Sequence, residues 1–393
     1  MRSGKPLRHV QTAVFPSPMK LRHGGTLPSI EVAYETYGTL NVARDNAVLI
    51  CHAITGDSHL ARHDEDDDPG WWERLVGPGK AVDTDRLFVI CSNVLGGCRG
   101  TTGPGTINPA TGTPYGSDFP LVTVEDMVDV QKRLVGLLGI TRLRAVVGGS
   151  LGGHQVLCWA TRYPDDVQTA VVIAASARLT AQAIAFDVVG RNAIQTDPHF
   201  HGGQYYSTGD FPQTGLALAR MLGHITYLSS EAMTRKFDLD RHAPRDIVTD
   251  FEKRFSVGSY LAYQGKQFVG RFDANSYVAV TLAMDNFDLG DTREARLESF
   301  RNAKCDWLVV SFSSDWLFPP KQSRELVALM TTLGQSVSYC EIETDGGHDS
   351  FLLSKDIEQF APLVAAKLGA PKPEPPRESP EDDRILQLLS LIH

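Results

Sequence analysis

The chain has 393 residues, 42% of them apolar and 22% charged, which is the composition of a folded globular protein with a large buried core. Its formal net charge of −9 argues against a nucleic-acid partner, because phosphate binding normally requires a basic surface. No apolar segment follows the basic residues near the N-terminus, so we expect no secretory signal, no membrane partner and a cytoplasmic location.

Strand-like runs separated by turns dominate the start of the chain. The first forty residues resemble a β-meander, in which residues 30–37 mix β-branched and aromatic side chains between turn-rich stretches. Residues 46–52 and 86–93 are short apolar runs. Such runs predict strands that are buried on both faces of a parallel sheet.

An alternation of helices and strands follows. Residues 123–138 predict an amphipathic helix that begins with a capping box, because Thr123 and Asp126 have the required spacing. A strand, a helix and another strand are predicted next, at 143–147, 152–163 and 168–175. This order predicts a parallel sheet with right-handed crossovers.

The alternation stops after residue 177, where helical patterns and polar turns replace it, and strand-like runs return at 305–312 and 336–343. A Pro-rich, charged segment ends the chain and predicts a linker or tail. We therefore expect four parts: a first core part (1–177), a helical lid insertion (178–301), a second core part (302–368) and a C-terminal tail (369–393).

One serine lies where a predicted strand turns into a predicted helix. The segment Gly148-x-Ser150-x-Gly152 has the spacing of a nucleophile elbow, a sharp turn that exposes the serine hydroxyl. Glycine on both sides lets the strand and the helix approach closely. An ordinary tight turn is the alternative for this pentapeptide, because Gly and Ser are common in turns.

A serine hydroxyl becomes a strong nucleophile only when a base takes its proton and a carboxylate orients that base. Asp315 and His348 follow Ser150 at the ends of successive predicted strands, and Asp306 and Asp345 are the nearest competing carboxylates. The order Ser, Asp, His is that of the α/β-hydrolase fold. We therefore predict this fold, with a mostly parallel central sheet and an inserted helical lid.

Attack of Ser150 on an ester or thioester carbonyl would create an oxyanion, which needs two hydrogen-bond donors. The residue after the nucleophile normally supplies one, so we assign it to the Leu151 backbone N–H. The loop after an early strand supplies the other, and we choose the Ile54 backbone N–H. His52, which precedes this loop, is assigned a structural role.

Five longer segments carry a family resemblance over about residues 10–365. They are residues 52–59 (HAITGDSH), 93–104 (NVLGGCRGTTGP), 148–153 (GGSLGG), 224–229 (HITYLS) and 347–351 (GHDSF). Together they resemble the homoserine O-acetyltransferase family of α/β-hydrolase-fold enzymes.

The resemblance implies a ping-pong acyl transfer in methionine biosynthesis. Ser150 would take an acetyl group from acetyl-CoA, and His348 would then activate the hydroxyl of L-homoserine to attack the acyl-enzyme. The products would be CoA and O-acetyl-L-homoserine. The resemblance also implies a homodimer formed through the lid.

The same resemblance implies substrate-binding residues. Arg220 would hold the carboxylate of homoserine, Asp349 would lie near its ammonium, and Tyr227 and Thr55 would line the pocket. An Arg fork can bind a carboxylate through two hydrogen bonds. Apart from the resemblance, Arg220 is predicted to be a solvated residue on a lid helix.

Several alternatives remain at this point. The chain has Leu151 where many family members have Met, so both acetyl and succinyl transfer stay open, as do homoserine and serine acceptors. A carboxylesterase of the same fold would use the same catalytic residues with water as acceptor. A catalytically silent binding module is disfavoured because Ser150, Asp315 and His348 are all present.

We expect no metal site and no permanently bound cofactor, with acetyl-CoA acting only as co-substrate. The six cysteines show no C-x-x-C spacing, and no P-loop motif is present. His59 and His63 lie beside the acidic run 64–68 without the spacing of a defined ligand set, so a solvated loop is predicted there.

Overall fold

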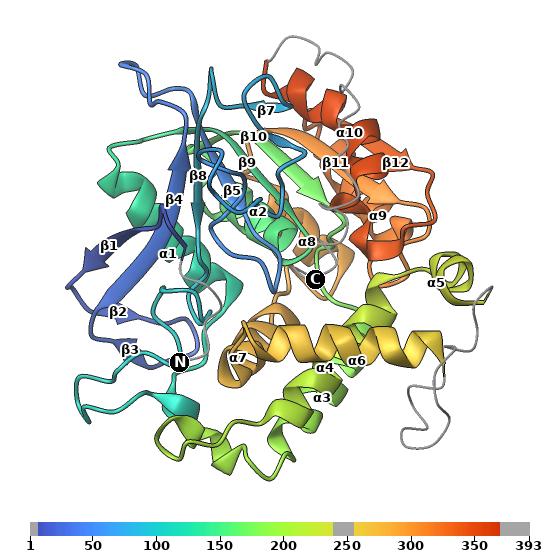
Figure 1. The fold of residues 1–393 in the computed structure, drawn as a ribbon. Coiled ribbons are helices and arrows are strands. Elements are labelled where there is room, and N and C mark those ends of the chain that lie inside the picture. Colours follow the sequence, from blue (N-terminus) through green and yellow to red (C-terminus); the bar gives the residue numbers. More distant parts are fainter. Residues whose placement is uncertain (1–6, 239–254, 370–393) are drawn as a thin grey trace.

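The computed structural model describes residues 7–238 and 255–369, and the predicted tail from residue 370 onward lies outside them (Figure 1). Its centre is an eight-stranded sheet in the order β1-β4-β8-β5-β9-β10-β11-β12. In that order the strands are Gln11–Phe15, Ile30–Tyr37, Phe88–Ser92, Ala47–Cys51, Leu143–Gly149, Val167–Ile173, Asp306–Phe312 and Val337–Ile342.

The six strands from β8 to β12 run parallel, while β1 and β4 add an antiparallel edge. This arrangement confirms the predicted fold class. The predicted N-terminal meander is wrong in its pairing, because β1 pairs directly with β4 and the short strands between them, β2 (Met19–Lys20) and β3 (Thr26–Leu27), form their own hairpin. A short parallel pair, β6 (Val76–Gly77) and β7 (Val82–Asp83), lies outside the main sheet.

Helices cover both faces of the sheet, which is why the central strands are almost continuously apolar. All five residues of β5 are buried. On one face, α1 (Val124–Leu137), α2 (Leu151–Arg162) and α9 (Pro320–Thr332) enclose the larger apolar cluster. On the other, α10 (Ser354–Lys367) packs with residues from the 60–87 segment.

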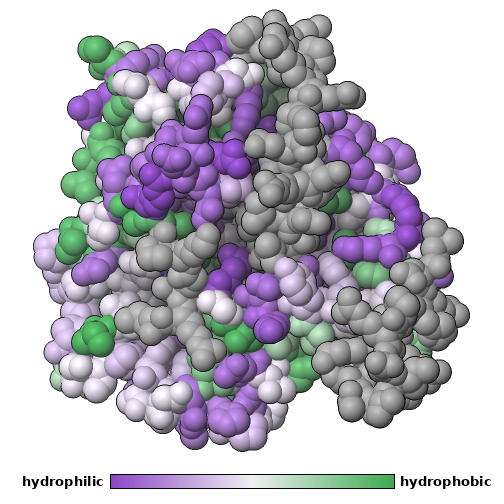
Figure 2. All heavy atoms as spheres, in the orientation of Figure 1, coloured by the Kyte–Doolittle hydropathy of each residue, from purple (hydrophilic) through white to green (hydrophobic). Residues whose placement is uncertain are grey.

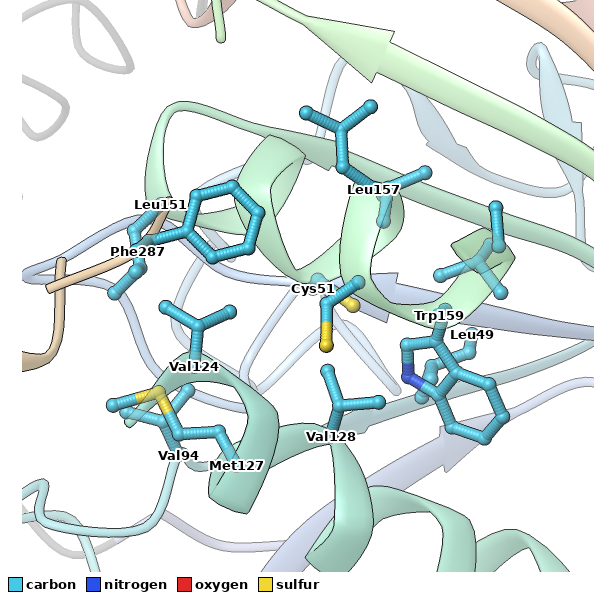
Figure 3. Packing of buried hydrophobic residues seen from close by; sticks show 14 of the residues in the cluster. Leu49, Cys51, Val94, Val124, Met127, Val128, Leu151, Leu157, Trp159 and Phe287 are labelled. Carbon is cyan, nitrogen blue, oxygen red and sulfur yellow. The ribbon is translucent and has the colours of Figure 1, made fainter. Parts of the chain in front are cut away.

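The contact between α1 and α2 forms a dense part of the core (Figure 3). Val124, Met127 and Val128 from α1 lie close to Cys51 of β5 and to apolar side chains of α2. The predicted capping box is confirmed, because the Thr123 hydroxyl accepts from the Asp126 N–H and the Asp126 carboxylate accepts from the Thr123 N–H. Local sequence and core packing therefore fix where α1 begins.

A group of helices lies at one end of the sheet (Figure 1). Its main members have a small apolar core of their own, which contains Leu216, Phe268 and Tyr277. The helices are α3 (Ala181–Gln195), α4 (Gln213–Tyr227), α5 (Ser230–Phe237), α6 (Ser256–Val269) and α7 (Ala274–Asp285). A further helix, α8 (Arg293–Phe300), instead contacts α9 of the core.

The surface in the orientation of Figure 1 is largely hydrophilic where it is described, with hydrophobic residues in smaller separate groups (Figure 2). Within residues 7–238 and 255–369, the helices are too short or too polar to cross a membrane.

We expect Thr123→Ala to lower the free energy of unfolding by about 1–2 kcal/mol, because it removes the hydroxyl that caps α1. Thr292→Ala removes the equivalent cap of the exposed helix α8 and should cost less, about 0.5–1 kcal/mol. Urea unfolding of both variants measures the difference. A loss at Thr292 equal to or above that at Thr123 would contradict the importance of the buried capping box.

Candidate active site

Ser150 lies at the junction of β9 and α2, with backbone angles φ 57° and ψ −124°. Two flanking glycines allow this turn. A Cβ atom at Gly148 would lie 2.4 Å from the Gly152 carbonyl oxygen, and one at Gly152 would lie 2.1 Å from the Cys51 carbonyl oxygen. Any larger residue would push β9, α2 and β5 apart, so the glycines are required by close backbone approach.

The structure brings Ser150, His348 and Asp315 together in one hydrogen-bonded chain. His348 Nε2 lies 2.9 Å from Ser150 Oγ, and His348 Nδ1 lies 2.8 Å from Asp315 Oδ2. All three residues are buried, and Oδ1 of Asp315 accepts from the N–H groups of Leu317 and Phe318. Asp315 is therefore held in place, and its second oxygen is free to orient the imidazole.

The environment of His348 favours its charged form. Burial opposes protonation of the imidazole, but the adjacent Asp315 carboxylate outweighs it and raises the pKa of His348 above its ordinary value. The competing carboxylates lie elsewhere: Asp306 binds Lys367 and Ser336, and Asp345 binds Lys355. This arrangement can accept a proton from the Ser150 hydroxyl.

The two predicted oxyanion donors lie on either side of Ser150. Leu151 is the first residue of α2, where backbone N–H groups have no intrahelical acceptor, and Ile54 lines the same small cavity as Ser150. His52 holds the Ile54 loop, because its Nε2 accepts from the Val94 N–H and its Nδ1 lies 2.7 Å from the Ala53 carbonyl oxygen. His52 thus makes structural contacts, as expected.

Arg220 points inward from α4 and is only 2% exposed, so the alternative of a solvated lid residue, considered apart from the resemblance, is wrong. Its guanidinium lies 4.8 Å from the centre of the Phe268 ring, and Nη1 donates to the Thr55 hydroxyl at 3.4 Å. Burial lowers the pKa of Arg220 to about 10, so it stays charged at neutral pH. Its Nε is buried and has no hydrogen-bond partner among the described groups.

Asp349 is the neighbour of His348 and is 9% exposed. Its Oδ1 is buried and has no hydrogen-bond partner among the described groups. Burial raises the pKa of Asp349 to about 6, although His348 and Arg220 oppose the shift. Tyr227 contacts both His348 and Arg220. Its ring centre lies 6.1 Å from that of the His348 ring and 6.0 Å from the Arg220 guanidinium.

Comparison with known proteins identifies the family of the chain. The α/β hydrolase fold family matches residues 46–355. The bifunctional methionine biosynthesis protein MetXA/MetW of Rhodopirellula baltica is 57% identical over 99% of this chain, which spans 64% of that protein's length. The homoserine O-succinyltransferase of Acidithiobacillus ferrooxidans is 51% identical over 91% of this chain and 94% of its own.

A protein named homoserine O-acetyltransferase, from Methanobrevibacter ruminantium, is also 51% identical over 89% of this chain and 72% of its own. The chain belongs to the homoserine O-acyltransferase family of the α/β hydrolase fold. Among solved structures, the homoserine O-acetyltransferase of Bacillus anthracis has a TM-score of 0.81 at 30% identity, with 94% of this chain and 100% of that chain covered. Esterase E22 has a TM-score of 0.82 at 30% identity, with 91% and 100% covered.

Of two cavities in this acyltransferase family member, one adjoins Ser150 and the other does not. A narrow one of about 30 Å³ adjoins Ser150 and Ile54 and also contacts Asp187, Tyr227 and Tyr277. A larger one of about 570 Å³ is lined by other residues, among them Tyr205, Tyr206 and Asp273, and does not include Ser150. The narrow cavity is the one at the reacting hydroxyl.

Asp187 was missed by the sequence analysis. It faces the narrow cavity from α3, whereas the next two residues, Val188 and Val189, are exposed on the outer side of the helix. A charged residue on the inner side of a lid helix gives no local motif. The sequence did contain one indication: Asp187 and Arg191 are four residues apart, and residues with this spacing lie on the same face of a helix.

The predicted solvated loop at His59 and His63 is wrong, because both side chains are largely withdrawn from solvent. His59 Nδ1 and His63 Nε2 lie 3.0 and 2.9 Å from the same oxygen of the fully buried Glu35. Burial opposes ionisation of Glu35, but hydrogen bonds from both histidines lower its pKa to about 2. Glu35, His59 and His63 are close enough together to hold a metal ion. The hydrogen bonds from the two histidines already satisfy the Glu35 carboxylate.

We expect His154 to make the fold sensitive to acid. The ring is fully buried, neither nitrogen has a hydrogen-bond partner, and burial lowers the pKa of His154 to about 3. The ordinary pKa of histidine is about 6.5. Below that pH, His154 binds a proton in the unfolded chain but not in the folded chain. Stability is therefore lost as the pH falls from about 6.5 towards 3, by about 2 kcal/mol between pH 7 and pH 5.

Urea unfolding at pH 7 and pH 5 tests this expectation. His154→Met replaces the ring by an apolar side chain and should remove about 2 kcal/mol of the pH dependence. His23→Met, at an exposed position, is the control and should behave as the unaltered chain. The same pH dependence in all three proteins would rule out His154 as the cause.

Proposed function

We propose that this chain transfers an acetyl group from acetyl-CoA to L-homoserine through a covalent acyl-Ser150 intermediate. The products are O-acetyl-L-homoserine and CoA, in methionine biosynthesis. One observation carries the proposal. Ser150, His348 and Asp315 form a hydrogen-bonded chain. Two buried charged residues near this chain, Arg220 and Asp349, each keep a polar atom without a hydrogen-bond partner among the described groups.

In the first half-reaction, His348 Nε2 takes the Ser150 proton while Oγ attacks the thioester carbonyl carbon. The Ile54 and Leu151 N–H groups stabilise the oxyanion, and Asp315 stabilises the imidazolium. The carbon–sulfur bond then breaks, and His348 returns the proton to the departing CoA sulfur. The acetyl group remains on Ser150.

In the second half-reaction, His348 takes the proton of the homoserine hydroxyl, whose oxygen attacks the acetyl carbonyl. The bond between the acetyl carbon and Ser150 Oγ breaks, and His348 returns the proton to Ser150 Oγ. Arg220 holds the homoserine carboxylate and the Asp349 carboxylate holds its ammonium, so the hydroxyl is presented to the acyl-enzyme. Tyr227 and Thr55 complete the pocket, and Thr55 orients Arg220.

Two other functions have specific support. Succinyl transfer is favoured by relatives named homoserine O-succinyltransferase, and ester hydrolysis by the likeness to esterase E22. Serine is the alternative acceptor, since it offers the same ammonium, carboxylate and hydroxyl groups. The two buried charges favour an amino-acid acceptor over water, because each costs stability unless a ligand pairs with it.

We further propose a cytoplasmic homodimer that forms through the lid, with no cofactor permanently bound. Apolar side chains are exposed on three adjacent lid helices: Val188 and Val189 on α3, Leu218 and Ile225 on α4, and Tyr263 on α6. Exposed apolar groups of this kind are buried when two copies associate.

Ser150→Ala should abolish acyl transfer and the acetyl-enzyme, because it removes the nucleophilic oxygen. Intact-protein mass spectrometry after mixing with acetyl-CoA measures the adduct, and circular dichroism checks that the fold is kept. Ser176→Ala, at a buried serine that binds the Arg178 carbonyl oxygen, is the matched control and should still form the adduct. A full adduct on Ser150→Ala would exclude this nucleophile.

Arg220→Lys keeps a positive charge but loses the planar fork that binds a carboxylate bidentately. Acylation by acetyl-CoA should stay near normal, while kcat/KM for homoserine falls by about tenfold or more, or at least about 1.4 kcal/mol. Measuring the two half-reactions separately tests this. An unchanged kcat/KM, or an equal loss in the acylation step, would remove Arg220 from the acceptor site.

A further inference from the structure

A pair of carboxyl groups lies behind the narrow cavity. Asp187 on α3 lies beside Asp285 at the end of α7, and Arg191 Nη2 donates to Asp285 Oδ2 at 2.6 Å. Oδ1 of Asp285 is buried and has no hydrogen-bond partner among the described groups. Like charges placed this close repel each other, so a further negative charge is disfavoured here.

The surroundings of Asp187 oppose its charged form. Burial and the neighbouring Asp285 raise the pKa of Asp187 well above its ordinary value, whereas Asp285 is paired with Arg191. Asp187 therefore offers the cavity carboxyl oxygens and no positive charge.

The cavity is the natural space for an acyl group attached to Ser150. It adjoins the Ser150 side chain and Ile54, and Asp187 forms part of its wall. Arg220 and Asp349, which are assigned to the amino acid, are not among the described residues that line it. Tyr227, which is assigned to the acceptor pocket, does line it, so the two sites adjoin at that ring.

We propose that Asp187, in the wall of this cavity, is a specificity residue that admits short uncharged acyl groups and rejects acyl groups that end in a carboxylate. This inference rests on the proposed acyl transfer through Ser150. It assigns acetyl rather than succinyl as the group that the site accepts.

Size and charge both support this selection. A cavity of roughly 10–15 Å³ holds one water molecule, so the volume of about 30 Å³ suits the methyl of an acetyl group and not a longer chain. A succinyl carboxylate would also meet the acceptor oxygen of Asp187 in a buried site. The nearby cation, Arg191, does not line the cavity and donates through Nη2 to Asp285. An unpaired buried charge and acceptor–acceptor contact both oppose binding.

The acylation half-reaction without homoserine tests the proposal. Single-turnover rates are measured by mass spectrometry with acetyl-CoA, succinyl-CoA and butyryl-CoA, which matches the succinyl carbon chain but lacks the carboxylate. The unaltered protein should acetylate at least about tenfold faster than it succinylates or butyrylates. Comparing the two longer donors separates charge from length.

Asp187→Asn is the decisive variant, because the amide keeps the shape of the side chain and has two N–H groups. One can bind Asp285 and the other can face the cavity as a donor to a carboxylate. We expect succinylation to rise about tenfold or more relative to butyrylation. Asp210→Asn, at an exposed position that binds His201, is the matched control and should leave the rate ratios unchanged.

The outcomes separate this proposal from the function on which it rests. Succinylation as fast as acetylation, or equal changes for succinyl and butyryl donors in Asp187→Asn, would overturn the role of Asp187 while acyl transfer stands. Failure of every donor to acylate Ser150 would overturn the proposed function and this inference together.

Discussion

The close approach of three backbone segments at Ser150 is the constraint on which the site depends. Gly148 and Gly152 let β9, α2 and β5 pack without side chains between them, so the serine is held in a left-handed conformation at the end of the sheet. The same approach brings the Ile54 loop next to the first turn of α2. Asp315 and His348 then need only follow β11 and β12, whose carboxyl ends share the same edge.

Around this centre, the lid and the loop after β12 each contribute a charge that the protein itself does not fully pair. Arg220 comes from α4 and Asp349 follows His348, and each keeps a buried polar atom without a partner. Such atoms destabilise the folded chain unless a ligand supplies the missing hydrogen bonds. Asp187 is different, since it lies beside a second carboxyl group, Asp285, and lines the cavity at Ser150. The site therefore combines unpaired charges for the acceptor with an acidic wall next to the nucleophile.

Prediction from sequence succeeded where the signal was local. The capping box at Thr123, the alternation of helices and strands, and the glycines around Ser150 each depend on a few neighbouring residues. It also succeeded for Ser150, Asp315 and His348, because their order at strand ends is itself a motif. It failed where side chains from distant segments meet without such a motif. His59 is buried only because Glu35 of β4 lies beneath its loop, and Arg220 is inward only because of how α4 packs on α6. Neither contact leaves a periodic pattern in the sequence.

The fate of the acyl-enzyme tests the central claim most directly, because a transferase and an esterase of this fold share the first half-reaction. The acetyl-enzyme would be formed with limiting acetyl-CoA and then mixed with buffer alone or with homoserine. Our account predicts that homoserine discharges the acetyl group far faster than water and that O-acetylhomoserine accumulates in equal amount. Discharge at the same rate in both mixtures, with free acetate as the product, would contradict it.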